Sequence, residues 1–425
     1  MNAASLKSTI LAGGLDKALA ALYGGDRLEA QRQRYCGAVD SFVEIYGDAD
    51  NLRLFSAPGR TEIAGNHTDH NYGRVLAASV NLDVIAVAAA NDSGVIAIQS
   101  KGYKMDRIEL SDLPLKEKEI NKAASLIRGM TARFVQKGLK VGGLNAYTTS
   151  DVLKGSGLSS SAAFEVLVGT ILNGLYNQGS VSPVEIAKYA QYAENVYFGK
   201  PSGLMDQMAS SVGGLITIDF ADPENPVIEP VGFDFSALGC ALCIVDTGGN
   251  HADLTDEYAA IPAEMKAVAG LFGEEVLRPV SYEALIAKAG EIRGKLGDRA
   301  LLRAIHFVNE NRRVEGIVAA LRRQDYAAFL KLLTESGRSS FCCLQNVYAN
   351  IAPKEQGVAL ALALADNLLK GEGAYRVHGG GFGGTTQNLV PEGLVETFKA
   401  GIEAVFGQGS CHILRIRPAG GVEVQ

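Results

Sequence analysis

A loop of glycine and serine residues is the segment of this sequence best suited to hold an anion. It runs directly into an apolar, helix-periodic segment at 162–176. Glycines let backbone N–H groups approach a ligand, and the first turn of a helix adds unpaired N–H donors and partial positive charge. These features predict a phosphate site, with a serine-rich helix cap as the simpler alternative. The loop residues are Gly155, Ser156, Gly157, Leu158, Ser159, Ser160 and Ser161.

A second cluster of hydrogen-bonding side chains begins at Arg60 and continues over 66–71. Asn, His, Thr and Asp at successive positions can bind several hydroxyls of a small polyol. Arg60 supplies a cation that can hold a phosphate or lower the pKa of a carboxylate. A solvated loop is the alternative, and a metal site is not favoured, because two histidines and one aspartate fall short of the HExxH pattern. The candidate residues are Asn66, His67, Thr68, Asp69 and His70.

Two acids and a second glycine cluster complete the candidate chemistry. Asp206 follows a turn of proline and glycine at 199–203, and Glu194 lies in the preceding predicted helix. Read alone, each acid has an ordinary alternative, a helix cap for Asp206 and a surface charge for Glu194. The run 379–384 places five glycines around Phe382. This composition permits a tight backbone turn against another loop, and a flexible hinge is the alternative.

Composition limits the classes of protein to which the chain can belong. It has 425 residues, of which 47% are hydrophobic, and 40 Lys and Arg against 47 Asp and Glu give a net charge of −7. The length suggests about two to three domains, and the hydrophobic content excludes disorder for the bulk of the chain. A chain this acidic has no diffuse electrostatic reason to bind nucleic acid or an anionic membrane.

Short apolar runs and few cysteines predict a cytoplasmic protein. The longest apolar run, 358–365, is far shorter than the roughly 20 residues of a membrane helix, and the N-terminus lacks the apolar core of a signal peptide. Cys240 and Cys243 have CxxC spacing, but they open an apolar, strand-like run, and no second CxxC or His pair completes a zinc site. We therefore expect buried thiols at these two positions.

Hydrophobic periodicity predicts a mixed α+β chain. No internal repeat or low-complexity linker marks a domain boundary, which we place between 215 and 235. The expected divisions are a helical extension at 1–48, an N-terminal domain at 49–225 and a C-terminal domain at 226–425. Helices are expected at 1–50, 120–138, 162–176, 183–197 and over most of 259–340, and strands at 52–57, 75–90, 140–150, 214–220 and 241–245.

Taken together, these segments resemble the GHMP kinase superfamily and, within it, the galactokinase family. Residues 57–71 are similar to the signature PGRVNLIGEHTDYN, 155–163 to the family phosphate loop, and 379–384 to the GGGFGG motif. Further segments at 193–195, 203–207 and 303–312 are similar to its AEN, GxMDQ and RAxHVxxENxR stretches. The matching segments keep the family's order from about residue 50 to about residue 415.

The resemblance implies an N-terminal domain like ribosomal protein S5 and a ferredoxin-like C-terminal domain, with ATP and a sugar between them. The loop 155–161 would cradle the triphosphate, and Ser161 and Glu194 would hold Mg²⁺. Asp206 would take the proton of the sugar C1 hydroxyl, and Arg60 would keep that aspartate ionised. The implied reaction is ATP-dependent phosphorylation of D-galactose to galactose 1-phosphate and ADP. The implied sugar contacts are Asn66, His67, Thr68, Asp69, Gly203 and Tyr258.

Departures from the family pattern fall mainly on the sugar side. The chain has Asn66 where the family has Glu, and His70 where the family has Tyr. These changes leave open a GHMP kinase for another sugar, such as N-acetylgalactosamine, arabinose or a uronic acid. A regulator that binds ATP and sugar without catalysis is the second alternative. The first 35 or so residues exceed the family's usual start and form either a helical brace or an oligomer contact. We expect a monomer or a weak homo-oligomer.

Overall fold

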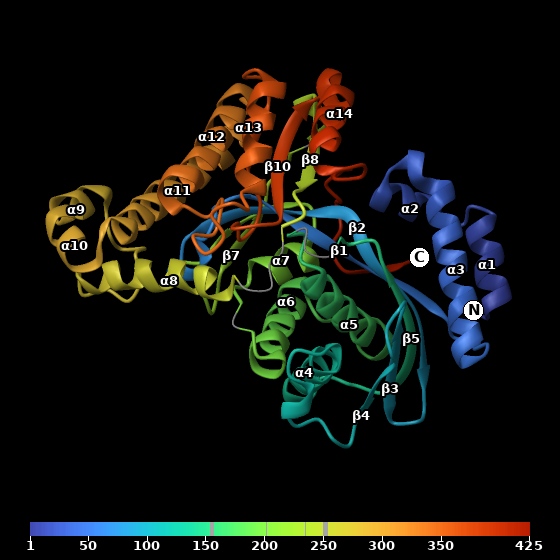
Figure 1. Ribbon diagram of the computed structural model, residues 1–425. Coiled ribbons are helices and arrows are strands. Elements are labelled where there is room, and N and C mark those ends of the chain that lie inside the picture. The colour runs from blue at the N-terminus through green and yellow to red at the C-terminus, as the bar shows by residue number, and fades with distance from the viewer. Residues whose placement is uncertain (154–156, 201, 234, 250–253) are drawn as a thin grey trace.

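The larger of two sheets is built mainly from strands of the N-terminal half of the chain (Figure 1). The computed structural model describes residues 1–153, 157–200, 202–233, 235–249 and 254–425. In these residues the larger sheet has eight strands: β1 (Arg53–Ala64), β2 (Arg74–Asn91), β3 (Val95–Ser100), β4 (Asp106–Glu109), β5 (Gly143–Ser150), β6 (Leu215–Asp219), β7 (Val227–Pro230) and β12 (Val422–Val424). Their order is β12-β1-β2-β5-β3-β4, with β6 beside β2 and β7 beside β6. The pair β3–β5 is parallel.

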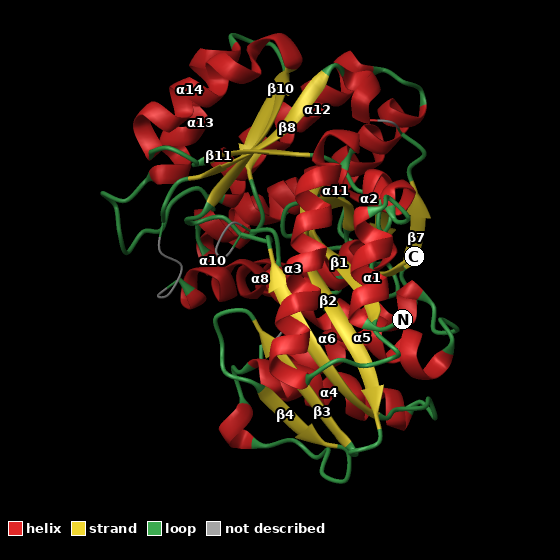
Figure 2. Ribbon diagram, turned by 90° about the vertical axis from the view of Figure 1, so that its right-hand side faces the viewer, coloured by secondary structure: helices red, strands yellow, loops and turns green. Residues whose placement is uncertain are grey.

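Strand alternation gives the larger sheet two apolar faces. Along β2, Ala86 and Ala88 face one core while Ile85 and Val87 face another, because successive side chains of a strand point to opposite sides. The first core is closed by α4 (Ala123–Gln136), α5 (Ser160–Asn177) and α6 (Pro183–Tyr192), with α7 (Met205–Val212) beside them. The second is closed by the N-terminal extension, which thus braces the sheet (Figure 2): α1 (Ala3–Leu11), α2 (Asp16–Tyr23) and α3 (Leu28–Tyr46).

The smaller, antiparallel sheet comes from the second half of the chain. Its order is β11-β8-β10-β9, with β8 (Cys240–Asp246), β9 (Ala374–Val377), β10 (Thr385–Pro391) and β11 (Cys411–Leu414). One face packs on α13 (Gly357–Leu369) and α14 (Val395–Phe406), and the other on α11 (Asp298–Arg322) and α12 (Tyr326–Ser339). The remaining helices, α8 (Thr255–Gly270), α9 (Tyr282–Ala287) and α10 (Ala289–Leu296), pack against the start of α11.

The expected mixed α+β architecture is confirmed, and most predicted elements lie close to their expected positions. Several features differ. Strand β1 continues to Ala64, beyond the expected 52–57, and strands β3 and β4 were not predicted. The helix expected at 183–197 changes into a π-helical turn, Ala193–Phe198, which carries Glu194. Strands β7 and β12 join the larger sheet although they lie within the expected C-terminal division. Within the described parts of the chain, no helix is long and apolar enough to cross a membrane.

Candidate active site

Asp206 lies at the centre of a cluster of three polar side chains from three elements. It belongs to the first turn of α7, Arg60 lies in β1, and Ser159 precedes α5. The Arg60 guanidinium donates to both carboxylate oxygens, from Nε to Oδ1 at 2.7 Å and from Nη2 to Oδ2 at 2.6 Å. The Ser159 hydroxyl donates to Oδ2 at 2.8 Å. Two irregularities in the β1–β2 register lie on either side of Arg60, a device by which strands aim a side chain.

The cluster keeps Asp206 ionised although its side chain is only 26% exposed. Burial raises the pKa of Asp206, but the charge of Arg60 and the hydrogen bonds from Arg60 and Ser159 outweigh it. The pKa therefore lies below its ordinary value. Burial also disfavours the charged form of Arg60, yet the carboxylate of Asp206 holds the pKa of Arg60 above its ordinary value. The result at neutral pH is an oriented carboxylate that faces a cation.

The start of α5 meets the second glycine loop beside this cluster. Ser159 occupies the N-cap position with a φ of +55°, and its hydroxyl goes to Asp206 instead of capping the helix. No acidic residue lies in the first turn of α5, so the helix end keeps its partial positive charge. Gly157 has a φ of +69°, and a Cβ there would come to 3.0 Å from His378 Nδ1. A larger residue would therefore separate the two loops.

An open cavity of about 900 Å³ connects these groups. Each of the three motifs singled out in the sequence contributes to its wall, so the fold brings together segments that are far apart along the chain. The lining includes Arg60, Gly157, Ser159, Ser160, Ser161 and Asp206, then His67, Asp69, His70 and Gly203, and from the C-terminal half Tyr258, Lys266, His378, Gly379, Gly380, Gly381 and Thr385.

Four of the six predicted sugar contacts line this cavity: His67, Asp69, Gly203 and Tyr258. The Nε2–H of His67 donates to the carbonyl of Gly380 at 2.9 Å, which leaves Nδ1 as an acceptor. Burial lowers the pKa of His67 to about 4, so the ring is neutral at pH 7. Gly203 is required beside Asp69, because a Cβ would come to 2.1 Å from Oδ2 of that carboxylate.

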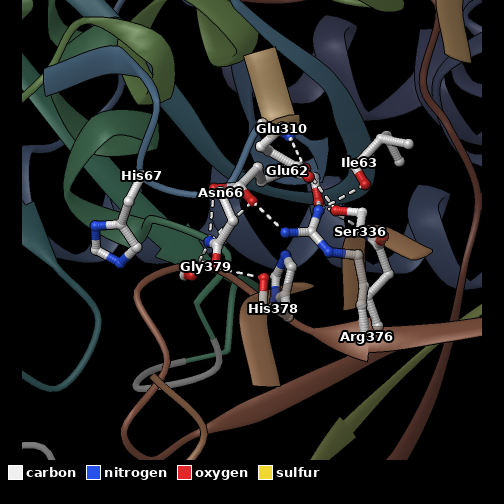
Figure 3. Close-up of polar contacts among 12 residues, drawn as sticks. Glu62, Ile63, Asn66, His67, Glu310, Ser336, Arg376, His378 and Gly379 are labelled. Carbon is white, nitrogen blue, oxygen red and sulfur yellow. Dashed lines mark hydrogen bonds and ion pairs between the residues drawn. The ribbon is translucent and has the colours of Figure 1, made fainter. Parts of the chain in front are cut away.

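Asn66 does not line the cavity, contrary to the expectation for a sugar contact. Its Nδ2 donates to the carbonyl of Gly379 at 2.7 Å and to Oε1 of Glu62 at 3.1 Å. Its Oδ1 accepts from Asn346 at 2.8 Å and from Ser340 at 3.2 Å. Figure 3 shows the side chain turned toward Glu62 and Gly379, while the adjacent histidine points away from them. Asn66 is thus occupied in joining β1 to the C-terminal half.

Other predicted binding residues also lie away from the cavity. The buried hydroxyl of Thr68 contacts the carbonyls of Gly65 and Arg74, which holds the turn of its own segment. Leu158 is fully buried, and its carbonyl accepts from the Arg60 N–H at 3.0 Å. Gly155 and Ser156 lie outside the described residues.

Glu194 lies behind the start of α5 and accepts hydrogen bonds from four side chains. Its Oε1 accepts from Ser161 Oγ at 3.3 Å and from Lys200 Nζ at 3.0 Å. Its Oε2 accepts from Ser202 Oγ at 2.5 Å and from Gln207 Nε2 at 2.8 Å. The side chain is 3% exposed. The fold therefore brings the predicted pair Ser161 and Glu194 together.

The sequence interpretation missed Glu62, Lys200, Lys266 and His378 as residues that border the cavity. Strand alternation could have found Glu62, which lies two residues beyond Arg60 on β1. Its carboxylate pairs with buried Arg376 at 2.7 Å. Burial raises the pKa of Glu62, although the charge of Arg376 opposes the shift. Lys266 belongs to α8, where the helical pattern alone carries no sign of a ligand.

Family models match two segments of the chain that contribute to this site. The GHMP kinases N terminal domain matches residues 110–214, and the galactokinase galactose-binding signature matches residues 40–90. The galactokinase of Streptomyces coelicolor is 31% identical over 379 residues, which cover 89% of this chain and 94% of that protein. The galactokinase of Glaesserella parasuis is 32% identical over 368 residues, covering 84% of this chain and 90% of that protein.

Solved structures of GHMP kinases also match the fold of this chain. The crystal structure of Lactococcus lactis galactokinase complexed with galactose matches with a TM-score of 0.77 at 25% identity, covering 90% of this chain and 98% of that chain. The mevalonate kinase of L. major, at 17% identity and a TM-score of 0.58, shares the fold and covers 88% of this chain and 97% of its own. The sequence resemblance is thereby confirmed, and this chain belongs to the galactokinase family of GHMP kinases.

Proposed function

We propose that this enzyme transfers the γ-phosphoryl group of ATP to the anomeric C1 hydroxyl of D-galactose, giving galactose 1-phosphate and ADP. The observation that carries the proposal is the ionised Asp206, held by Arg60 and Ser159 at the wall of a cavity that the start of α5 also lines. The match to a galactose-binding signature and the likeness to a galactokinase complexed with galactose support this sugar. The comparisons do not favour a kinase for another sugar or a non-catalytic regulator.

In this proposal the start of α5 binds the phosphates. Free N–H groups and partial positive charge at a helix N-terminus stabilise anions, and Ser160 and Ser161 add hydroxyls at the same wall. Arg60 and Lys200 add positive charge. Phosphoryl transfer passes through a loose transition state, so positioning and charge stabilisation contribute more than covalent catalysis. The proposed domains 49–225 and 226–425 both contribute to the cavity wall, the second through Tyr258 and Lys266.

Asp206 orients the C1 hydroxyl and accepts its proton. The C1 oxygen forms a bond to the γ-phosphorus while the bond from that phosphorus to the β–γ bridging oxygen breaks, and the electron pair of that bond leaves with ADP. A carboxylate with a lowered pKa is a weak base. Proton transfer therefore follows the formation of the new P–O bond, and orientation of the hydroxyl is the larger part of the role of Asp206.

Ser161 and Glu194 are the residues that would hold Mg²⁺. Their oxygens are the hard ligands that Mg²⁺ prefers, and this ion is usually bound through one or two carboxylates together with substrate phosphates. The observation that supports this assignment is the distance of 3.3 Å between the Ser161 hydroxyl and the Glu194 carboxylate at the start of α5. The described residues contain no group of three or more His, Cys, Asp or Glu suited to a metal. When bound, the ion neutralises charge on the phosphates.

The proposed sugar contacts are those predicted residues whose side chains or backbone line the cavity, namely His67, Asp69, Gly203 and Tyr258. Neutral His67 offers Nδ1 as an acceptor, and the carboxylate of Asp69 accepts from a sugar hydroxyl. Asn66 is left out of this set because its polar atoms are bonded within the protein.

Release of ADP from Mg-ATP in the presence of free sugars tests the proposal. The panel is galactose, N-acetylgalactosamine, glucose, arabinose and galacturonate, and phosphorus NMR locates the transferred phosphate. We expect fast release with galactose and a 1-phosphate product. Asp206→Asn is the matched control, since it keeps the size of the side chain and removes the base. Turnover on a different sugar alone would show that this sugar, and not galactose, is the substrate. ADP release that does not depend on any sugar would contradict the assignment as a sugar kinase.

A further inference from the structure

We infer that Glu62 takes the place of Asn66 as a specificity-determining residue, accepting a hydrogen bond from a hydroxyl of the sugar. The inference rests on the proposed function, because it requires a neutral sugar in the cavity between Arg60, Asp69 and Tyr258. Five observations carry it: the position of Glu62 on β1, the free capacity of its carboxylate, the occupation of Asn66, the exchange of two residue types in the signature, and the support from Arg376.

Glu62 borders the cavity from the same side of β1 as Arg60, as expected for residues two positions apart on a strand. Its side chain is 5% exposed. Oε1 accepts from Arg376 Nη2 at 2.7 Å and from Asn66 Nδ2 at 3.1 Å. In the described chain, the hydrogen bond recorded for Oε2 is a long contact of 3.4 Å from Asn66. An ionised carboxylate has about four acceptor positions, so Oε2 retains capacity for a donor from a ligand.

Asn66 has no comparable capacity. Both hydrogens of its amide are directed at protein acceptors, the carbonyl of Gly379 and the carboxylate of Glu62. Its Oδ1 already accepts from Asn346 and Ser340. The side chain is fully buried and does not border the cavity. A sugar hydroxyl could reach Asn66 only if these bonds were broken, and each buried group left unpaired would cost about 1–3 kcal/mol.

At Glu62 and Asn66, the acid and the amide have exchanged positions relative to the signature PGRVNLIGEHTDYN. That signature has Asn at its fifth position and Glu at its ninth, whereas this chain has Glu62 and Asn66 at those positions. The two side chains are hydrogen-bonded neighbours. The chain therefore retains one carboxylate and one amide at this point of the site, and the carboxylate is the group on the cavity side.

Arg376 keeps the Glu62 carboxylate in place. The guanidinium is fully buried, and its Nη1 donates to the carbonyl of Ile63 at 2.6 Å (Figure 3). An acceptor that is already fixed loses little conformational entropy when it binds a ligand. Glu62 and Asp69 together place two carboxylates at the sugar end of the cavity. This charge selects neutral sugars with hydroxyl donors over uronic acids, because like charges repel.

Chemical double-mutant cycles test this inference. Wild type, Glu62→Gln and Glu310→Gln are compared with galactose and with its monodeoxy analogues, for both sugar KM and sugar Kd by calorimetry. Glu310 is the matched control: its carboxylate accepts from the Gly65 N–H at 3.0 Å and from Ser336 at 2.5 Å in the same cluster, but it does not border the cavity.

We expect Glu62→Gln to raise the sugar KM about 10- to 100-fold, the loss of a hydrogen bond to a charged group, with the KM for ATP unchanged. One deoxysugar lacks the hydroxyl that Glu62 binds. For that sugar, wild type and Glu62→Gln should have the same KM. Glu310→Gln should retain the wild-type sugar KM for every analogue. The ratio of galacturonate to galactose binding should rise in Glu62→Gln.

Two results would overturn the inference: a sugar KM in Glu62→Gln as low as in wild type, or an equal rise for galactose and every deoxysugar, which would indicate a purely structural role. If Glu62→Gln does not fold, Glu62→Asp is judged by the same criteria, since it keeps the charge beside Arg376 and withdraws the acceptor. Binding of sugar without turnover by wild type would contradict the proposed function alone, and the Kd values would still decide the role of Glu62.

Discussion

Asp206 and Asp83 are both aspartates bound by arginine, but they lie in different surroundings. Asp206 borders the cavity with 26% of its side chain exposed. Asp83, in β2, has no exposed surface. It accepts from Arg34 Nη1 at 2.7 Å, from Arg417 Nη1 at 3.0 Å and from the Tyr23 hydroxyl at 2.5 Å. The Ser56 hydroxyl also donates to it.

The comparison separates what ionises an aspartate from what gives it a function. Burial raises the pKa of Asp83, but Arg34, Arg417 and the hydroxyl donors outweigh it, so the pKa lies below its ordinary value, as it does for Asp206. The acceptor positions of Asp83 are filled by donors from the N-terminal helices, β1 and the chain before β12. Asp83 therefore ties the extension to the sheet, whereas Asp206 remains open to a substrate.

The largest expected effect is on the rate of Asp206→Asn. The amide cannot accept the C1 proton and lacks the charge that pairs with Arg60, so kcat should fall by about 10²- to 10⁴-fold. The free energy of unfolding should fall less than in Asp83→Asn, because a single buried arginine, Arg60, loses its carboxylate partner. Initial-rate kinetics and urea unfolding measure the two quantities. A kcat near that of wild type would remove Asp206 from the chemistry.

Asp83→Asn should have the opposite profile, a loss of stability without a loss of kcat in the folded enzyme. Removing the carboxylate leaves the buried charge of Arg417 uncompensated and leaves Arg34 with Asp151 alone as its partner, which costs about 3–5 kcal/mol. Urea unfolding at neutral pH measures it. A normal unfolding free energy combined with a loss of kcat would contradict the division of roles.

The pH dependence gives the same variant a second test. The folded-state pKa of Asp83 is lowered, so its contribution to stability is present above the unfolded-state pKa of about 4 and is lost as the pH falls through the folded-state value. The unfolding free energies of wild type and Asp83→Asn should therefore converge on acidification. A constant difference between them at all pH values would show that charge is not the cause.

A matched pair of serine variants sharpens the comparison, because each aspartate accepts from one serine hydroxyl. Ser159→Ala should lower kcat by about tenfold through misorientation of Asp206, with unchanged stability. Ser56→Ala should cost about 1–3 kcal/mol of unfolding free energy, with unchanged kcat. Kinetics and unfolding of both variants together measure the contrast. Equal effects of the two variants on both quantities would contradict it.

The smallest expected effect concerns Glu165, a buried carboxylate of α5 without a bonded arginine or lysine among the described residues. Its Oε2 accepts from Gln207 at 3.2 Å, and burial, reinforced by Glu194, raises its pKa well above the ordinary value. Folding then binds a proton, so stability falls as the pH rises above about 4.5. Glu165→Gln should remove part of this pH-dependent loss of stability. At acidic pH its free energy of unfolding should lie within about 1 kcal/mol of that of wild type. Unfolding measured across pH checks the slope; an unchanged slope would mean that Glu165 is ionised in the fold.

Local patterns explain why most elements and the phosphate loop could be predicted from the sequence. Helical and strand periodicity is a property of neighbouring residues, and it located β2, β5 and α5 close to their observed positions and the start of β1. The glycines and serines before α5 likewise indicated a helix start at the cavity. The same reasoning could not show that the Ser159 hydroxyl turns to Asp206, since the two residues belong to different elements.

The directions of the side chains at the end of β1 and in the irregular segment after it could not be predicted from the sequence. Asn66 and Thr68 were predicted to contact a sugar, but both bond to protein groups, and Glu62 borders the cavity instead. The motif order along the chain gave no sign of this, because the partners of Asn66 come from the segments around Ser340, Asn346 and Gly379.

By itself the sequence determined the family, the mixed α+β architecture and the acidic charge, and it predicted Ser159, Ser160 and Ser161, which line the cavity. Only the tertiary structure decided which ionised aspartate is open to a substrate and which of Glu62 and Asn66 faces the cavity. The physical reason is that both outcomes depend on donors from distant segments. Arg376 approaches Glu62 across 314 residues of chain, and Arg417 approaches Asp83 across 334. Such contacts form only when the two sheets and the N-terminal helices pack together.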